Sequence, residues 1–165
     1  LQYDRPRVAL LSNGEEDTKG NALIKDTATL LKNTSLNFIG NIEPNELMTS
    51  KADVILMDGF VGNIVLKMFE ATAKYMSSLI REELKSDLRS SIGGLLARPA
   101  FGRIRQRVDT EVVGGAPLLG VNGVVIIGHG RTSAVGIKNA ISQAHRAVKS
   151  DVIQAITESL GDLSK

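Results

Sequence analysis

The sequence predicts an α/β protein built on an open, mostly parallel sheet with helices on both faces. Short apolar runs recur along the 165 residues, and a glycine-rich or polar loop and then a helical stretch follow most of them. The chain has only 4 prolines, and 42% of its residues are hydrophobic. This alternation is typical of α/β folds, and the length suits a single domain with a buried core over residues 1–165.

The first part of the chain supplies three expected strands, at residues 7–11, 36–42 and 54–57. The third is almost wholly apolar, as expected for a strand covered on both faces. A helix is expected over 21–32, and a shorter one over 43–49 can begin with Pro44, because proline is tolerated in a first turn. Ligands of open α/β sheets bind at the carboxyl ends of the strands, so the loops that follow these strands are candidate sites.

A long apolar stripe follows the third strand. Apolar residues recur every three or four positions from Val61 to Leu95, which predicts one long helix broken at Gly93-Gly94. Such a helix is much longer than average, so part of it is expected to project as a helical hairpin over 61–108. A fourth strand is expected within 121–130, and helix in one or two pieces from 133 to 160.

The net charge of +2 is unevenly distributed. Between positions 89 and 107 the chain has five arginines and no acid, whereas the remaining residues carry 15 basic and 18 acidic side chains. Local basic charge favours an anionic partner at one place over general nucleic-acid binding. No apolar run approaches the roughly 20 residues of a membrane span, and the absence of cysteine fits a reducing compartment.

Two glycine-rich loops are candidates for chemistry. In MDGFVGN, Asp58 closes a strand and precedes a helix, whose first N–H groups can cradle an anion. Asp58 can orient a group or take part in proton transfer, but a capped strand-to-helix turn explains this loop equally well. In VVGGAPLLG, the double glycine allows close backbone approach to a ligand, or simply a turn.

Two further positions have functional and structural interpretations. His129, in GHG, can donate to a phosphoryl or carbonyl oxygen or exchange a proton near neutral pH, although a single histidine is more often structural. In the opening loop, NGEEDTKGN, Lys19 can hold a phosphate as a point charge. The acids of that loop are interpreted as a solvated turn or as partners of the following helix dipole, with Glu15 the one of interest.

Several kinds of site are excluded by their motifs. The chain has no P-loop, no G-x-G-x-x-G after a strand and no G-x-S-x-G elbow. Two distant histidines and no cysteine make a zinc site improbable, so neither metal nor cofactor is expected. An anion-handling site that works by positioning and charge stabilisation remains.

Six motifs occur here in the order found in the PlsX family, the bacterial phosphate acyltransferases of phospholipid synthesis. They are SNGEEDTKGN, NFIGNIE, ADVILMDGFVGN, GGAPLLG, GVVIIGHG and IKNAI, and the resemblance runs from about Val8 to Ala147. The resemblance implies transfer of a fatty acyl group from acyl carrier protein to inorganic phosphate. It also implies a homodimer in the cytoplasm with a three-layer α/β/α architecture, similar to phosphotransacetylases and isopropylmalate dehydrogenases. A dehydrogenase activity is disfavoured, because no nicotinamide fingerprint is visible.

The resemblance implies that these loops meet around phosphate and the acyl thioester. The residues predicted to be catalytic are Lys19, Asp58, Asn63 and His129. Those predicted to bind substrate are Gly20, Gly59, Phe60, Gly62, Gly114, Gly115, Ala116, Pro117 and Gly130. Lys19 and backbone amides near Gly62 and Gly115 would hold phosphate, whereas Asp58, Asn63 and His129 would orient the nucleophile or the thioester carbonyl. Ser12-Asn13 and Arg131-Thr132 differ from the residues expected beside these motifs and receive no role.

In the family, the region of the long helix resembles a hairpin used for dimerisation and peripheral membrane attachment. The residues predicted to contact membrane or carrier protein are Leu84, Leu88, Ile92, Leu95, Arg98, Arg103 and Arg105. The apolar members can lie in an anionic headgroup layer beside the arginines. Equally, the arginines can receive acidic acyl carrier protein, or the helix can pack in a dimer with a solvated basic face.

Family members are longer than this chain, and their early half carries a Gly-Gly-Asp loop that this chain lacks. The chain is therefore interpreted as the later half of such a protein. The alternative to a phosphate-dependent acyltransferase is a non-catalytic fragment that dimerises and binds carrier protein or membrane.

Overall fold

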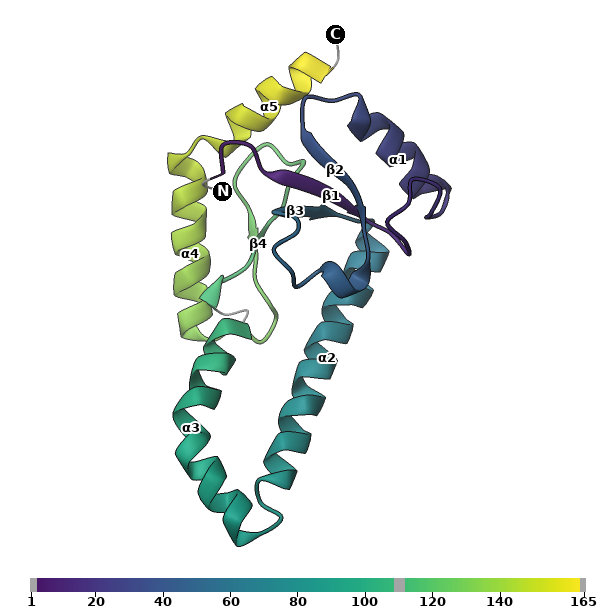
Figure 1. Ribbon diagram of the computed structural model, residues 1–165. Helices are drawn as coiled ribbons and strands as arrows, with labels where there is room; N and C mark the ends of the chain where they lie inside the picture. The colour runs from purple at the N-terminus through teal and green to yellow at the C-terminus, as the bar shows by residue number, and fades with distance from the viewer. Residues whose placement is uncertain (1–2, 109–111, 164–165) are drawn as a thin grey trace. The chain divides into compact units, whose positions relative to one another are not determined.

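The computed structural model describes residues 3–108 and 112–163. The chain forms two compact units, residues 1–81 and 82–165. In the first unit a parallel sheet places β1 (Arg7–Leu11) between β2 (Asn37–Ile42) and β3 (Val54–Leu56) (Figure 1). The predicted α/β class and the three predicted strands of this unit are confirmed.

The core of the first unit is centred on β1. Val8, Ala9, Leu10 and Leu11 are all buried, together with Ile42 on β2. The helix α1 (Ala22–Lys32) packs against β1 and β2 and buries Ala28. Its start matches the predicted position, because the Asn21 side chain accepts a hydrogen bond from the Ile24 N–H at 3.0 Å. A central strand with neighbours on both sides requires a continuous apolar run, and this is what β1 supplies.

The pairing of β1 with β2 contains a bulge. Val8 lies opposite Phe38, but Leu10 lies opposite Asn41, so β2 has one extra residue between these pairs. The bulge changes the register so that buried Asn41 pairs with Leu10, and the Asn41 side-chain amide donates to the Glu16 carbonyl oxygen at 3.1 Å. The sheet is thereby tied to the loop that follows β1.

A bidentate ion pair joins the start of β1 to the segment before β3. The Arg7 guanidinium donates from Nε and Nη2 to the two carboxylate oxygens of Asp53, both at 2.9 Å. The backbone N–H of Arg7 also donates to Asp53, at 2.8 Å. These hydrogen bonds, led by the one from the Arg7 side chain, lower the pKa of Asp53 to about 2.

Two expectations about the helices are corrected. The short helix over 43–49 is a single 3₁₀ turn, η1 (Pro44–Glu46), with Pro44 in its first turn as predicted. The helix α2 (Gly59–Glu83) ends well before Gly93-Gly94, and both glycines lie inside the next helix, α3 (Leu88–Val108). The predicted break at the glycines was wrong because Asp87 caps α3: its carboxylate accepts from the Ser90 N–H at 2.9 Å, and such a local cap outweighs the modest cost of glycine within a helix.

The second unit contains α3, α4 (Ala134–Lys149) and α5 (Val152–Leu163), with a two-stranded antiparallel sheet of β4 (Ala116–Pro117) and β5 (Ile126–Ile127). The predicted strand over 121–130 is thus only two residues long. It pairs with β4 in an antiparallel sheet, because a short connection makes this local pairing easy to close. The predicted helix over 133–160 is present in two pieces, separated at Asp151, which has a positive φ of 51°. None of the described helices is both long enough and apolar enough to cross a membrane.

The Arg7–Asp53 pair predicts an acid-sensitive stability. Because the folded pKa of Asp53 is about 2, below its ordinary value, its contribution is complete above about pH 4 and is lost as the pH falls toward 2. We expect Asp53→Asn to lower the urea midpoint at neutral pH and to lack this part of the pH dependence. Asp26→Asn, an exposed carboxylate on α1, serves as the control. Equal pH profiles for Asp53→Asn and the unchanged chain would contradict the prediction.

Candidate functional site

The loop after β1 carries Lys19 in the first unit. The loop closes on itself, since the Gly20 N–H donates to the Asn13 side chain at 2.9 Å and the Lys19 N–H donates to the Glu16 carbonyl oxygen at 3.0 Å. Gly20 has a φ of +90°, and a Cβ there would lie 2.6 Å from the Ile24 side chain. Gly20 therefore lets the chain turn from the loop directly into α1.

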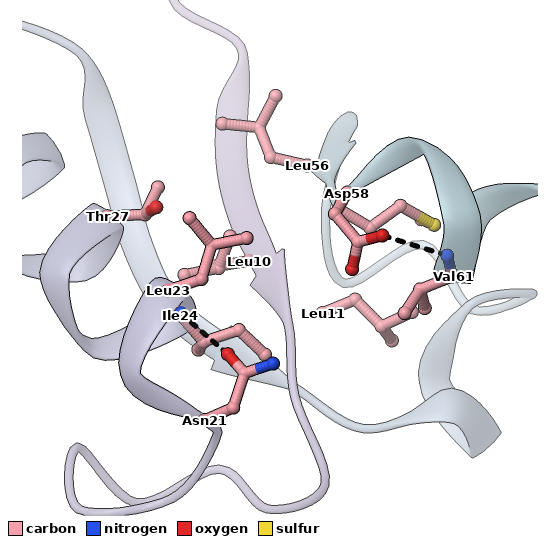
Figure 2. Close-up of a pocket in the computed structure, with 10 residues that line it drawn as sticks. Leu10, Leu11, Asn21, Leu23, Ile24, Thr27, Leu56, Asp58 and Val61 are labelled. Atoms are coloured by element: carbon pink, nitrogen blue, oxygen red, sulfur yellow. Dashed lines mark hydrogen bonds between the residues drawn. The ribbon is translucent and has the colours of Figure 1, made fainter.

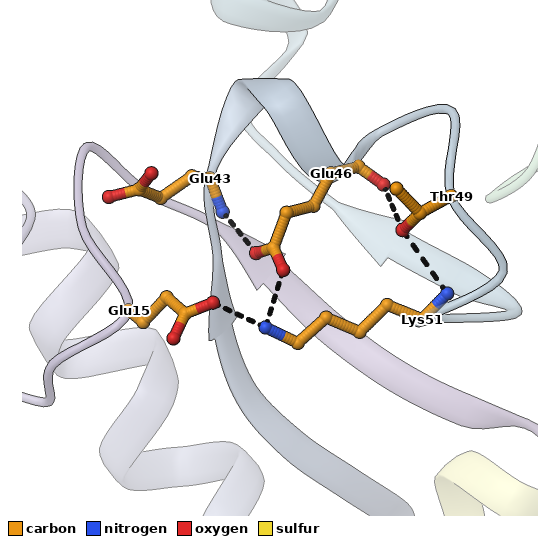
Figure 3. Close-up of polar contacts among 5 residues, drawn as sticks. All are labelled: Glu15, Glu43, Glu46, Thr49 and Lys51. Carbon is orange, nitrogen blue, oxygen red and sulfur yellow. Dashed lines mark hydrogen bonds and ion pairs between the residues drawn. The ribbon is translucent and has the colours of Figure 1, made fainter.

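Charged groups in this loop hold it in place (Figure 3). Lys51 Nζ lies 2.5 Å from a Glu15 carboxylate oxygen and 2.6 Å from one of Glu46. Glu46 is itself fixed, because its other oxygen accepts from the Glu43 N–H at 3.1 Å. Hydrogen bonds to Glu15 and Glu46 raise the pKa of Lys51, and the bond from Lys51 lowers that of Glu46. The sequence alone indicated no role for Lys51, because Lys51 belongs to no recognisable motif.

The same network leaves Lys19 available. Asp17 is engaged by Lys32 Nζ at 2.6 Å, so two of the three loop acids are paired with lysines other than Lys19. Lys19 is exposed, and its ammonium makes no hydrogen bond or ion pair with any residue in 3–108 or 112–163. The amides of Ala22 and Leu23 precede the first intrahelical bond of α1, from Lys25 to Asn21, and likewise have no acceptor in those ranges. A free cation thus stands beside the positive end of a helix dipole.

The turn between β3 and α2 is a helix cap. Asp58 accepts hydrogen bonds through one carboxylate oxygen from the N–H groups of Phe60 at 2.9 Å and Val61 at 3.0 Å. The Gly62 N–H donates to the Asp58 carbonyl oxygen at 2.9 Å. The Gly62 N–H therefore already has an acceptor, and the binding of phosphate by backbone amides near Gly62 stays a prediction. The capping interpretation of Asp58 is confirmed, and Gly59, Phe60 and Asn63 lie exposed in the first turns of α2.

A pocket lies between these two loops, at the carboxyl ends of β1 and β3 (Figure 2). It has a volume of about 340 Å³. Its lining is mostly apolar and comprises Leu10, Leu11, Asn21, Leu23, Ile24, Thr27, Leu56, Met57, Asp58 and Val61. The sequence predicted the location through the strand-end rule. It did not identify the lining residues from α1, because only the packing of α1 on the sheet brings them there.

Close packing within the second unit explains why its double-glycine motif has no side chains. Gly114 is buried with a φ of +88°, and a Cβ there would lie 2.3 Å from the Ala140 backbone nitrogen of α4. A Cβ at Gly115 would lie 2.6 Å from the Ile127 carbonyl oxygen of β5. The space next to both glycines is thus filled by the unit's own backbone. Ala116 and Pro117 form β4 and are exposed.

His129 is exposed in the turn between β5 and α4. Its Nδ1 accepts a hydrogen bond from the Arg131 N–H at 3.2 Å, which assigns the imidazole proton to Nε2. The Thr132 hydroxyl and N–H both donate to the His129 carbonyl oxygen. The turn holds the ring so that Nε2–H is the group left to donate, with Gly130 exposed beside it. This geometry is compatible with the predicted donation to a substrate oxygen.

Each unit gathers its own share of the predicted residues. In the first unit, the residues at the carboxyl ends of β1 and β3 are Lys19, Gly20, Asp58, Gly59, Phe60, Gly62 and Asn63. In the second unit, the residues around β4 and β5 are Gly114, Gly115, Ala116, Pro117, His129 and Gly130. Among the residues that the structure describes, no cluster of three or more histidine or carboxylate side chains is arranged to hold a metal ion.

Comparison with known proteins identifies the family. A model of the family described as "Fatty acid synthesis protein" matches residues 1–155. The chain belongs to this family. It is the PlsX family indicated by the six motifs.

The curated relatives extend this assignment. The chain is 47% identical over 160 residues to a "Phosphate acyltransferase" of Geotalea uraniireducens, covering 97% of this chain and 46% of the relative. It is 48% identical to a "Phosphate acyltransferase" of Dictyoglomus turgidum, and the match covers 96% of this chain and 48% of the relative. It is 46% identical to a "Phosphate acyltransferase" of Helicobacter pylori strain J99, and the match covers 99% of this chain and 48% of the relative. The chain thus spans about half the length of the curated relatives it matches.

In this member of the family, α3 presents the predicted contact residues. Leu88 is 77% exposed and Leu95 67% exposed, and Ile92 is also exposed. Leu84, before α3, is half-buried and lies against Gly94. The side chains of Arg98 and Arg103 are exposed, whereas the side chain of Arg105 lies outside the described part of the chain. Apolar and basic side chains therefore share one accessible helix.

The close packing at Gly114 gives a prediction for the second unit. Gly114→Ala places a Cβ on the backbone of α4 at positive φ, and we expect a loss of more than about 2 kcal/mol in the free energy of unfolding. Gly120→Ala is the matched control, because Gly120 has a φ of +82° but nothing within 4 Å of its Cβ position. Its expected loss is about 1 kcal/mol. Urea denaturation of both variants tests this, and equal losses would contradict the packing argument.

Proposed function

We propose that this chain carries catalytic loops of an acyltransferase that moves a fatty acyl group from acyl carrier protein to inorganic phosphate. The observation that carries the proposal is 46–48% identity, over nearly the whole chain, to proteins named phosphate acyltransferase. The exposed Lys19 beside the start of α1 supports it, because a free ammonium and open helix amides suit a phosphate.

The reaction is balanced without a cofactor. An oxygen of hydrogenphosphate attacks the thioester carbonyl carbon, a C–O bond forms and the C–S bond breaks. The thiolate of the carrier protein leaves, and the proton of hydrogenphosphate ends on its sulfur. Catalysis of such a transfer needs positioning of the two substrates and stabilisation of charge on the carbonyl oxygen.

The predicted residues have distinct roles in this proposal. Lys19 and the first turn of α1 hold phosphate, and Asn63 orients the nucleophile or the thioester. His129 donates through Nε2–H to a developing oxyanion, a role supported by the hydrogen bond that Nδ1 accepts. Asp58 acts as a positioning residue, because its carboxylate holds the first turn of α2, directly before Asn63.

The wider family resemblance completes the proposal. We infer a cytoplasmic homodimer with a three-layer α/β/α core, in which α2 and α3 form a projecting helical hairpin. This arrangement accounts for the exposed apolar and basic side chains of α3, because a partner or surface would then cover them.

Lys19 is the residue on which the activity is expected to depend. We expect Lys19→Met to lower kcat/KM for phosphate by about 10- to 100-fold, the value of a charge-assisted hydrogen bond. The assay measures incorporation of labelled phosphate into acyl-phosphate from palmitoyl-carrier protein. It uses the chain alone and the chain supplied with the first half of the Geotalea uraniireducens relative.

Lys25→Met, an exposed lysine on α1, is the control for loss of a positive charge. The urea midpoint of Lys19→Met should equal that of the unchanged chain, because the Lys19 ammonium has no partner in the described ranges. Absence of acyl-phosphate in both assay formats would reject the proposed reaction. Equal effects of the two substitutions would reject the role of Lys19.

The second candidate, a membrane-binding module, is favoured by the exposed apolar and basic side chains of α3. Leu88→Glu should weaken sedimentation with vesicles containing anionic lipid by about tenfold or more, because it places a carboxylate where apolar area would be buried. Thr72→Glu on α2 is the control for added negative charge. Equal vesicle binding of Leu88→Glu and the unchanged chain would remove this candidate.

A further inference from the structure

We propose that the pocket between β1, β3, α1 and α2 receives the carboxyl-proximal part of the fatty acyl chain. The proposal rests on the proposed function and assigns an acyl subsite to it. The pocket lies wholly within the first unit, and its volume of about 340 Å³ is at the small end for ligand sites. It can therefore take the first part of a long chain, with the remainder leaving through its open side.

The walls of the pocket suit a saturated chain. Leu10 and Leu11 of β1 form a buried wall, and Leu56 and Met57 close the end of β3. The two capping groups in the lining are already engaged: Asn21 accepts from Ile24, and Asp58 accepts from Phe60 and Val61. Of the described residues that line the pocket, Asp58 alone has a charged side chain. An aliphatic ligand therefore displaces water there without breaking these hydrogen bonds.

The rim has the opposite character. Asn21 and Asp58 cap α1 and α2, so the N-terminal ends of both helices lie at the pocket (Figure 2). Helix N-terminal ends carry partial positive charge. Lys19 precedes Asn21 by two positions, which places the loop with the free ammonium at the same edge. The Asp58 carboxylate offsets the positive end of α2, so the positive side of the rim is the one at the start of α1. The chemistry that fits an apolar pocket with one positive side is an aliphatic tail joined to an anionic or carbonyl head group.

This placement also fits the bond that must form. A phosphate held by Lys19 and the first turn of α1 lies next to the mouth of the pocket that Asn21, Leu23 and Ile24 help to line. An acyl chain in the pocket would bring its carbonyl carbon to that mouth. The two reacting groups would then be held by adjacent parts of one helix.

The test uses alkyl phosphates from butyl to decyl, below their micelle concentrations, as stable analogues of the acyl-phosphate. Their affinities, and that of inorganic phosphate, are measured by titration calorimetry with the 165-residue chain. Each methylene that enters the pocket should tighten binding about fourfold, and the effect should end when the pocket is full. Thr27→Trp fills the pocket from α1 and Leu56→Gln makes its wall polar, so both should flatten this dependence. Thr29→Trp, on the exposed side of α1, should leave it unchanged.

Folding of each variant is checked by circular dichroism, and the two pocket variants provide independent tests. Phosphate binding without dependence on chain length would overturn the acyl assignment while leaving the phosphate site in place. The same result is expected if another polypeptide segment fills the pocket. Equal flattening by Thr27→Trp and Thr29→Trp would also overturn it, because the association would then be non-specific. Dependence on chain length without binding of inorganic phosphate would support the pocket and reject the proposed phosphate site.

Discussion

The burial of β1 between two parallel neighbours is the constraint on which the first unit depends. Four consecutive apolar residues of β1 are removed from water, and β2 and β3 supply the hydrogen bonds that its backbone requires. Because the strands run parallel, their carboxyl ends reach the same edge of the sheet. The Lys19 loop and the Asp58 turn leave the sheet at that edge, so the position of both motifs follows from burying one strand.

The sheet sets the position of these loops, and polar interactions then set their conformation. The Arg7–Asp53 pair joins the starts of β1 and β3, and the bulge in β2 carries Asn41 to the loop after β1. Lys51 connects that loop to η1 through Glu15 and Glu46. Exposed ion pairs of this kind contribute little to global stability, but several acting on one loop restrict its conformations. Two of the three loop acids, Glu15 and Asp17, are engaged by Lys51 and Lys32, and Lys19 is left as an exposed cation.

The two units use their glycine-rich motifs differently. In the first unit, Gly20 lets the Lys19 loop enter α1, and the pocket opens beside that turn. In the second unit, Gly114 and Gly115 let backbone segments approach each other, so their lack of side chains serves packing on α4 and β5. A glycine-rich sequence therefore marks close approach in both units. Only the neighbours decide whether a ligand or the protein fills the space.

The sequence by itself determined the α/β class, the bounds of β1, the positions of the helices that begin near residues 21 and 133, and the family, because these depend on local patterns and ordered motifs. The predicted helix break at Gly93-Gly94 was wrong, because the cap formed by Asp87 sets the helix boundary. The strand predicted over 121–130 is only the short β5, which pairs with its neighbour β4. Only the tertiary structure decided that the Gly62 amide is occupied, that Lys51 holds Glu15, and that α1 and β3 enclose an apolar pocket. These features join residues far apart in the chain, and no local pattern encodes which distant groups will meet.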